Sequence, residues 1–175
     1  MTEQWYALRS KPRKEIVVWR QVLARGFESY FPRIKVNPVN PRSSKVRAYF
    51  PGYLFVKADI EDVGKSTFQW MPHTLGLVSF GGEPSSVPEN LIHDIRKRVD
   101  EINAAGGEIF DGLKPGEKVW IKDGPFKDYQ AIFDARISGS ERVRVLLELL
   151  NSQRQVPVEL DIGKIERKQT KKRRS

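Results

Sequence analysis

The hydrophobic pattern changes character once along the chain, and this change constrains the fold more than any other feature. Up to about residue 103, segments with strand spacing alternate with segments with helical spacing, whereas only short strand-like segments follow residue 112. Residues 104–111 begin with Ala-Ala-Gly-Gly and break both patterns. A chain of 175 residues has room for two small domains. We therefore predict an α+β domain over residues 1–103, a linker over 104–111 and a second domain over 112–166.

The first domain mixes strands and helices. Strands are predicted over residues 5–10, 28–36 and 77–80 and within 49–58, and helices over residues 14–25 and 88–102. Gly26 suits the end of the first helix, and Pro88 suits the first turn of the second. Residues 37–44 are rich in proline, asparagine and serine and predict a loop. We expect an antiparallel sheet with its helices on one face.

The most apolar segment of the first domain has two apolar faces. Because side chains alternate along a strand, Tyr53 and Phe55 project to one side, and Leu54 and Val56 project to the other. One pair enters the core under the helices. The other pair is covered by another part of the chain or held by a partner, and the residues alone leave both readings open.

The second domain is predicted to be a small closed β-barrel. Its expected strands cover residues 117–122, 130–137, 142–150 and 156–160. Turn residues separate them, namely Asp123-Gly124-Pro125, Ser138-Gly139-Ser140 and Asn151-Ser152. About fifty residues of closely spaced strands fit such a barrel.

Positive charge gathers at the two ends of the chain. Residues 1–47 hold eleven basic and three acidic side chains, and residues 167–175 hold six basic and no acidic ones. The end segment is predicted to be a disordered tail that either solubilises the chain or contacts phosphates. Lys11, Arg13 and Lys14, together with Arg9, lie among segments that should fold, and they can form a fixed phosphate-binding spot.

Composition argues against catalysis and against a membrane protein. The chain has no cysteine, and His73 and His93 complete no pattern of metal ligands or of a catalytic triad. We expect no catalytic residues, no metal and no cofactor, and read the histidines as ordinary loop and helix residues. Neither a signal peptide nor a spanning segment is evident, so the expected location is the cytoplasm and no membrane partner is expected.

Several segments resemble NusG-type transcription elongation factors. The first domain shares with their N-terminal (NGN) domain Trp5-Tyr6-Ala7-Leu8, Phe50-Pro51-Gly52-Tyr53-Leu54-Phe55-Val56 and Val87-Pro88. Residues 115–131 resemble the KOW motif of their SH3-like C-terminal barrel, with Gly116, Val119, Gly124, Pro125 and Phe126. The resemblance extends to about residue 166. Residues 130–133 and 146–151 are similar to RfaH, a specialised paralogue of NusG, and residues 156–160 to ordinary NusG. A specialised NusG paralogue is indicated.

This resemblance implies a function without catalysis. The first domain would bind the clamp helices of RNA polymerase through Phe50, Pro51, Tyr53 and Phe55. Its basic edge would face upstream or non-template DNA through Lys11, Arg13, Lys14 and Arg20. A monomer would thereby suppress pausing or termination, and its KOW domain would recruit a ribosomal protein or a termination factor.

Two other functions were considered. An RNA-binding ribosomal or ribosome-assembly protein would use a basic KOW barrel, whereas residues 113–166 hold nine basic and nine acidic side chains. An enzyme would need a pocket with paired titratable groups, which the sequence does not indicate.

The resemblance also raises a question about the second domain. In RfaH-like proteins this domain packs as a helical hairpin over the polymerase-binding patch and refolds to a barrel on release. A carboxylate before the Phe-Pro pair holds that closed form, but here Arg47 stands there and Arg142 stands at the partner position. Because two like charges repel, and because the turn residues favour a barrel, we expect the barrel as the resting state.

Overall fold

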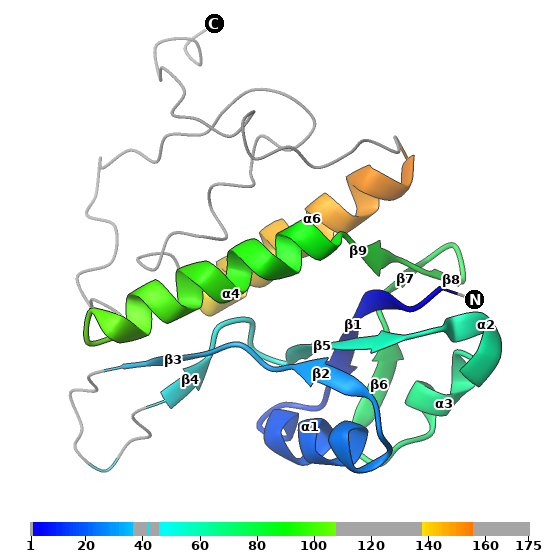
Figure 1. Cartoon of the computed structure of the whole chain (residues 1–175), viewed down its shortest axis with the longest axis horizontal. Coiled ribbons are helices and arrows are strands. Elements are labelled where there is room, and N and C mark those ends of the chain that lie inside the picture. The colour runs from blue at the N-terminus through cyan, green and yellow to red at the C-terminus, as the bar shows by residue number, and fades with distance from the viewer. Residues whose placement is uncertain (1, 37–41, 43–45, 108–137, 156–175) are drawn as a thin grey trace, which may run out of the picture.

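A central antiparallel sheet organises the chain (Figure 1). The computed structural model describes residues 2–36, 42, 46–107 and 138–155. Strand β1 (Gln4–Ser10) lies inside the sheet, where it pairs with β5 (Tyr53–Ala58), with β6 (Thr74–Leu77) and with β9 (Ser86–Val87). Strand β2 (Glu28–Tyr30) extends the sheet beyond β5. The predicted α+β class with an antiparallel sheet is confirmed for this part of the chain.

Shorter elements complete the first domain. Two small hairpins pair β3 (Arg33–Lys35) with β4 (Val46–Ala48) and β7 (Ser79–Phe80) with β8 (Glu83–Pro84). Residues 61–76, for which the sequence favours no single element, contain most of α2 (Ile60–Val63), all of α3 (Ser66–Gln69) and the start of β6. The strand expected over residues 28–36 is divided at Phe31 and Pro32, because proline has no N–H to donate to a neighbouring strand.

Two of the helices agree with the sequence pattern. Helix α1 (Glu15–Ala24) buries Val18 and Val22, and Gly26 follows it with φ +88°, a conformation that favours glycine. Helix α4 (Glu89–Ala104) follows Pro88 and buries the predicted apolar stripe, which consists of Leu91, Ile92, Ile95, Val99 and Ile102. Among the described residues, no helix is both long and apolar enough to cross a membrane.

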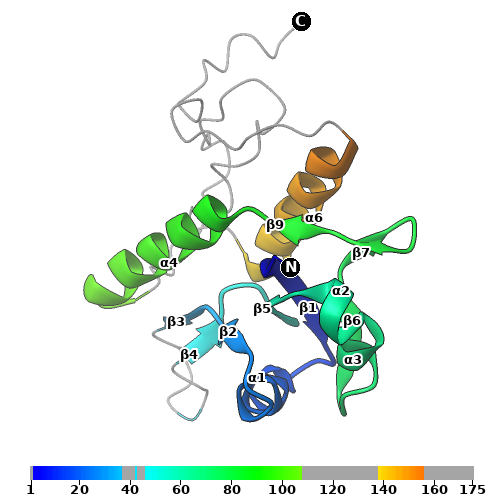
Figure 2. The same cartoon turned by 45° about the vertical axis from the view of Figure 1, so that its right-hand side comes forward.

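The sheet is covered on both faces, so the prediction of helices on one face alone is wrong. On β1, Tyr6 and Leu8 pack in one cluster with Val18 and Val22 of α1. Trp5 and Ala7 point the other way and pack in a second cluster with the apolar stripe of α4 and with α6 (Gly139–Gln155). Figure 2 shows α1 and α6 on opposite sides of β1.

Helix α6 lies where the sequence predicts a strand over residues 142–150, and that prediction is wrong. Ser138 provides the reason, since its hydroxyl accepts the N–H of Glu141 at 3.2 Å and its carbonyl accepts the N–H of Arg142 at 3.0 Å. Ser-x-x-Glu is a sequence that begins helices, whereas the composition of Ser138-Gly139-Ser140 by itself indicates a turn. The expected barrel resting state is therefore also wrong for residues 139–155. The other strands predicted for the second domain lie outside the described residues. The turn predicted at Asn151-Ser152 is wrong, because both residues lie within α6.

Candidate functional site

The Phe50-Pro51-Gly52-Tyr53 segment forms a tight turn before β5. The N–H of Tyr53 donates to the carbonyl of Phe50 at 3.0 Å, and Gly52 has φ +83°. Proline followed by a glycine with positive φ is the requirement of a type II turn. Neighbouring segments hold the turn, because the N–H of Ser10 donates to the Gly52 carbonyl at 2.8 Å and the Gly52 N–H donates to Glu15 at 2.7 Å.

Aromatic rings around this turn form one packed group. The Tyr49 and Phe50 rings meet edge to face at 5.0 Å, and Phe50 meets Phe55 in the same way at 5.9 Å. The ring of Tyr30 stacks on the ring of Phe55, with 6.3 Å between the two ring centres. Tyr49, Phe50 and Phe55 are fully buried, Tyr53 is half-buried and Pro51 is exposed. The turn therefore presents a rigid apolar surface with aromatic rings beneath it.

Helix α6 covers this surface. Its buried side chains, Val145, Leu146, Leu149 and Leu150, belong to the same apolar cluster as Phe50 and Phe55, and Tyr53 packs against that cluster. At the far end of the contact, the hydroxyl of Ser85 lies 3.3 Å from the Leu150 carbonyl, to which it donates. The sequence leaves open whether a partner or another part of the chain covers the second pair of apolar side chains in this segment. The structure shows that α6 covers Phe55 and packs against Tyr53.

Arg142 anchors the first turn of α6. It is only 2% exposed, its Nε donates to the Tyr49 carbonyl at 2.8 Å, and its guanidinium lies 4.2 Å from the centre of the Tyr49 ring. A guanidinium suits this position because it donates hydrogen bonds in a plane and also stacks on aromatic rings. The expected repulsion by Arg47 does not keep α6 away, because Arg142 binds the carbonyl and the ring of Tyr49.

Gly139 makes the closest approach between α6 and the turn. A Cβ atom at Gly139 would lie 2.7 Å from both Cδ and Cγ of Pro51, which is closer than side chains pack. Only glycine therefore fits here while the helix is docked. Sequence analysis did not identify this role for Gly139, and the Ser138-x-x-Glu141 pattern is the signal that could have placed a helix start beside it.

The predicted nucleic-acid residues lie on and next to the turn before α1. Lys11, Arg13 and Lys14 are exposed, and the N–H of Lys14 donates to the Lys11 carbonyl at 3.1 Å. Arg20 is also exposed, but it lies further along α1. Since Ser10 and Glu15 both bond to Gly52, the basic turn is adjacent to the Phe50–Tyr53 turn. The structure therefore brings two of the predicted sites together at one end of β1.

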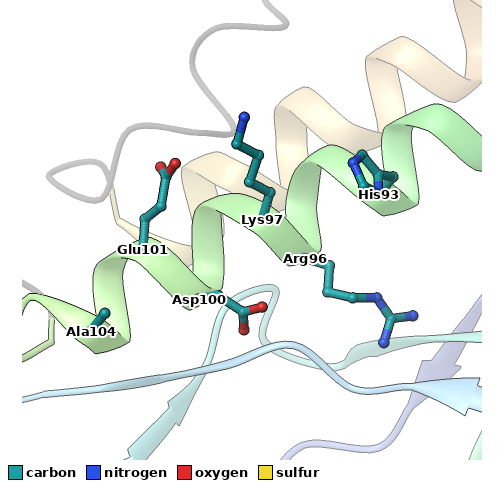
Figure 3. Close-up of a pocket in the computed structure, with 6 residues that line it drawn as sticks. All are labelled: His93, Arg96, Lys97, Asp100, Glu101 and Ala104. Carbon is teal, nitrogen blue, oxygen red and sulfur yellow. The ribbon is translucent and has the colours of Figure 1, made fainter.

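A shallow hollow runs along the outer face of α4 (Figure 3). It is lined by His93, Arg96, Lys97, Asp100, Glu101 and Ala104, all from this helix. Arg96 reaches toward the strands, where its guanidinium lies 4.2 Å from the ring centre of Tyr30, and burial raises the pKa of that tyrosine. Two basic residues are followed by two acidic ones along this exposed helix face, and such a mixture of charges is usual on a solvated surface.

The two histidines lie apart. His73 is in the loop before β6, whereas His93 is on α4. Within the described residues, no group of three or more acidic or histidine side chains could hold a metal ion. The KOW residues Gly116, Val119, Gly124, Pro125 and Phe126 lie outside the described part of the chain.

Known proteins resemble this chain over most of its length. A protein from Deinococcus radiodurans described as "Transcription termination/antitermination protein NusG" is 24% identical over 94% of this chain and 99% of its own length. Its counterpart from Haemophilus influenzae is 23% identical over 94% of both chains. A solved structure, "Domain interaction in Thermotoga maritima NusG", is 25% identical over 72% of this chain and 76% of its own, with a TM-score of 0.42.

The family model supplies the assignment. The model described as "NusG: Transcription termination factor nusG" matches residues 3–96. These residues include β1, the Phe50–Tyr53 turn and the first half of α4, so the match covers both predicted sites on the first domain. Since it also covers more than half of the 175 residues, the chain belongs to the NusG family and is a NusG-like transcription factor.

Proposed function

We propose that this transcription termination/antitermination factor binds RNA polymerase through the Phe50–Tyr53 turn and Phe55, and thereby suppresses pausing or termination. Family membership supports the role in transcription. The packing of the turn supports the location, because rigid aromatic groups are frequent anchors at protein interfaces. The partner surface on the polymerase is the clamp helices, as the resemblance implies. The protein acts by binding and catalyses no reaction.

The observation that carries this proposal is that α6 packs over the Phe50–Tyr53 turn. Four apolar side chains of α6 are buried in the same cluster as Phe50 and Phe55. A polymerase helix and α6 cannot occupy this surface together. We therefore infer that the structure is a closed form, and that α6 leaves the turn before the polymerase binds.

The second domain then acts as the recruiting module. After release, residues 139–155 join a KOW barrel, as in the RfaH-like proteins that this chain resembles, and the barrel recruits a ribosomal protein or a termination factor. The segment supports such a change because Val143 and Val145 alternate as in a strand, although they are helical here. The monomer thus couples polymerase binding to recruitment.

Nucleic acid is the second ligand of the first domain. Lys11, Arg13 and Lys14 contact phosphates of upstream or non-template DNA, with Arg20 further along α1. Their exposure and the positive charge of this part of the chain support the assignment. Because the basic turn adjoins the Phe50–Tyr53 turn, one end of β1 can face the polymerase and its DNA at once.

The test compares two double variants in co-elution with core RNA polymerase. An opened variant, Gly139→Ala with Arg142→Ala, introduces the Pro51 clash and removes the Tyr49 contacts. A matched variant, Ser140→Ala with Arg144→Ala, also introduces two alanines and removes one arginine, one and two positions further along α6, at exposed residues. We expect the opened variant to bind polymerase at least about tenfold more tightly than the matched variant, because closed molecules do not bind.

A third variant tests the surface itself. Tyr53→Ala in the opened background should weaken binding about tenfold or more, since truncating an aromatic anchor removes much of an interface's affinity. Tyr53 is chosen because it is half-buried, whereas Phe55 is a core residue whose truncation would destabilise the domain. Equal polymerase affinity of the opened and matched variants, or no effect of Tyr53→Ala, would contradict the proposal.

A further inference from the structure

Trp70 is the most exposed of the large apolar side chains that the structure describes. Its exposed fraction is 79%, whereas the other large apolar residues at the described surface lie between 41% and 47%. Tryptophan is highly buried on average and is enriched at interfaces, so an indole in solvent is available to contact a ligand. Trp70 follows the last residue of α3, and its N–H donates to the Ser66 carbonyl at 3.1 Å.

The loop that carries Trp70 is held rigidly. Phe68, two positions before Trp70, and Met71, directly after it, are buried, so the exposed indole stands between two anchors. The Thr74 hydroxyl lies 2.8 Å from the Met71 carbonyl, and the Thr74 N–H donates to the same carbonyl at 3.2 Å. An aromatic group that is fixed before binding loses little conformational entropy when a ligand stacks on it.

The basic turn before α1 adjoins this loop. The N–H of Lys11 donates to the His73 carbonyl at 2.9 Å, and the Gln21 side chain of α1 donates to the Pro72 carbonyl at 2.8 Å. The exposed cations of residues 11–14 and the indole of Trp70 therefore lie on neighbouring loops that are bonded to each other.

Backbone strain marks the same two loops. Among the described residues, Arg13 and His73 are the non-glycine residues with positive φ, at +65° and +71°. Such conformations are unfavourable for side chains other than glycine, and they concentrate at binding sites where the surrounding structure enforces them. One strained residue lies in the basic turn and the other lies three positions after Trp70.

From these observations we propose that Trp70 stacks on a base of single-stranded nucleic acid whose phosphates are bound by Lys11, Arg13 and Lys14. Stacking on an aromatic side chain beside cations is how proteins hold single strands, and it needs a base face that is free. In a duplex both faces of each base are already stacked, so Trp70 gives the site a preference for single strands. This inference rests on the nucleic-acid contact proposed above and adds the strandedness and the stacking residue.

The test measures fluorescence anisotropy of two labelled DNAs with the full-length chain: an oligothymidine, and a duplex with the same number of phosphates. Trp70→Ala should weaken binding of the single strand about tenfold and leave both the duplex affinity and the salt dependence unchanged. Trp70→Phe keeps an aromatic ring and should retain most of the affinity. Leu75→Ala is the matched control, because Leu75 is a second exposed apolar residue nearby, at 44%.

Replacing Lys11, Arg13 and Lys14 together with glutamine should weaken both DNAs and flatten the salt dependence of the single strand by about two units of slope. The inference is overturned if Trp70→Ala binds the single strand like the wild type, if it loses duplex affinity equally, or if Leu75→Ala causes the same loss. Polymerase co-elution of the Trp70→Ala protein separates the two proposals. Normal co-elution with weakened single-strand binding supports the stacking role, whereas the polymerase proposal is judged by the opened variant alone.

Discussion

Arg142 shows how one side chain can hold a helix on a surface through a backbone carbonyl and an aromatic ring. Its guanidinium combines a hydrogen bond to the Tyr49 carbonyl with stacking on the Tyr49 ring, and both contacts are buried. A hydrogen bond from a charged donor contributes about 1.5–3 kcal/mol. A second arginine, Arg144, forms only exposed ion pairs with Glu141 and Glu148 in the same helix. Pairs of that kind contribute a few tenths of a kcal/mol.

These two arginines give a prediction at the scale of the residue. Arg142→Ala should accelerate hydrogen exchange of the α6 amides about tenfold or more, because it lowers the free energy of opening α6. Arg144→Ala should accelerate it about twofold, and the amides of β1 and β5 should be unaffected by either change. Arg142→Lys should behave nearly like Arg142→Ala, since an ammonium does not reproduce the planar contacts. Equal effects of the Arg142 and Arg144 substitutions would show that Arg142 is no anchor.

At the scale of the element, α6 is the one long helix among the described elements that the sequence pattern did not predict. For α1 and α4 the apolar residues follow helical spacing only, so a single period indicates the structure. In α6, Val143 and Val145 fit a strand while Val145, Leu146, Leu149 and Leu150 fit a helix. Local preference therefore does not decide between a helix and a strand. Packing against Phe50 and Phe55 selects the helix.

The same reasoning explains what could be predicted of the site. The Phe-Pro-Gly-Tyr turn and the basic turn are each contiguous in sequence, so their residues could be named from the sequence. Their adjacency depends on the bonds that Ser10 and Glu15 make to Gly52, which join residues more than thirty positions apart. The approach of Gly139 to Pro51 joins still more distant residues. Such contacts leave no periodic signal in the sequence.

A prediction for the element follows from its dependence on packing. Most of the stability of a helix of this length comes from packing of its apolar face rather than from the helix itself, and α6 has 17 residues. The opened variant should therefore lose helical ellipticity in the far ultraviolet, relative to the matched variant, by about the share that 17 of 175 residues represent. A gain of strand signal should accompany the loss, because in the proposed function the released segment joins a barrel. Unchanged helix in the opened variant would mean that α6 does not need the turn.

At the scale of the whole molecule, β1 connects two surfaces, of which one is covered by α6 and the other is exposed to solvent. Helix α6 covers Phe50 and Phe55 on one face of the sheet, and α1 covers the other face. The basic turn between β1 and α1 is exposed while α6 is docked. In the proposed function, the closed form therefore blocks the polymerase surface of the first domain and leaves the basic turn accessible. Nucleic acid can bind before the polymerase surface is uncovered.

This difference gives the last prediction, in which the opened and matched variants are titrated with the same single-stranded DNA. Their affinities should agree within about twofold, because both variants have lost one arginine and both retain Lys11, Arg13 and Lys14. Polymerase affinity should differ between the same two proteins about tenfold, as argued above. A parallel rise of DNA and polymerase affinity on opening would place the nucleic-acid site under α6 or in the released segment. In that event the exposed turn before α1 would not be the DNA site, and the two surfaces of the first domain would be controlled together.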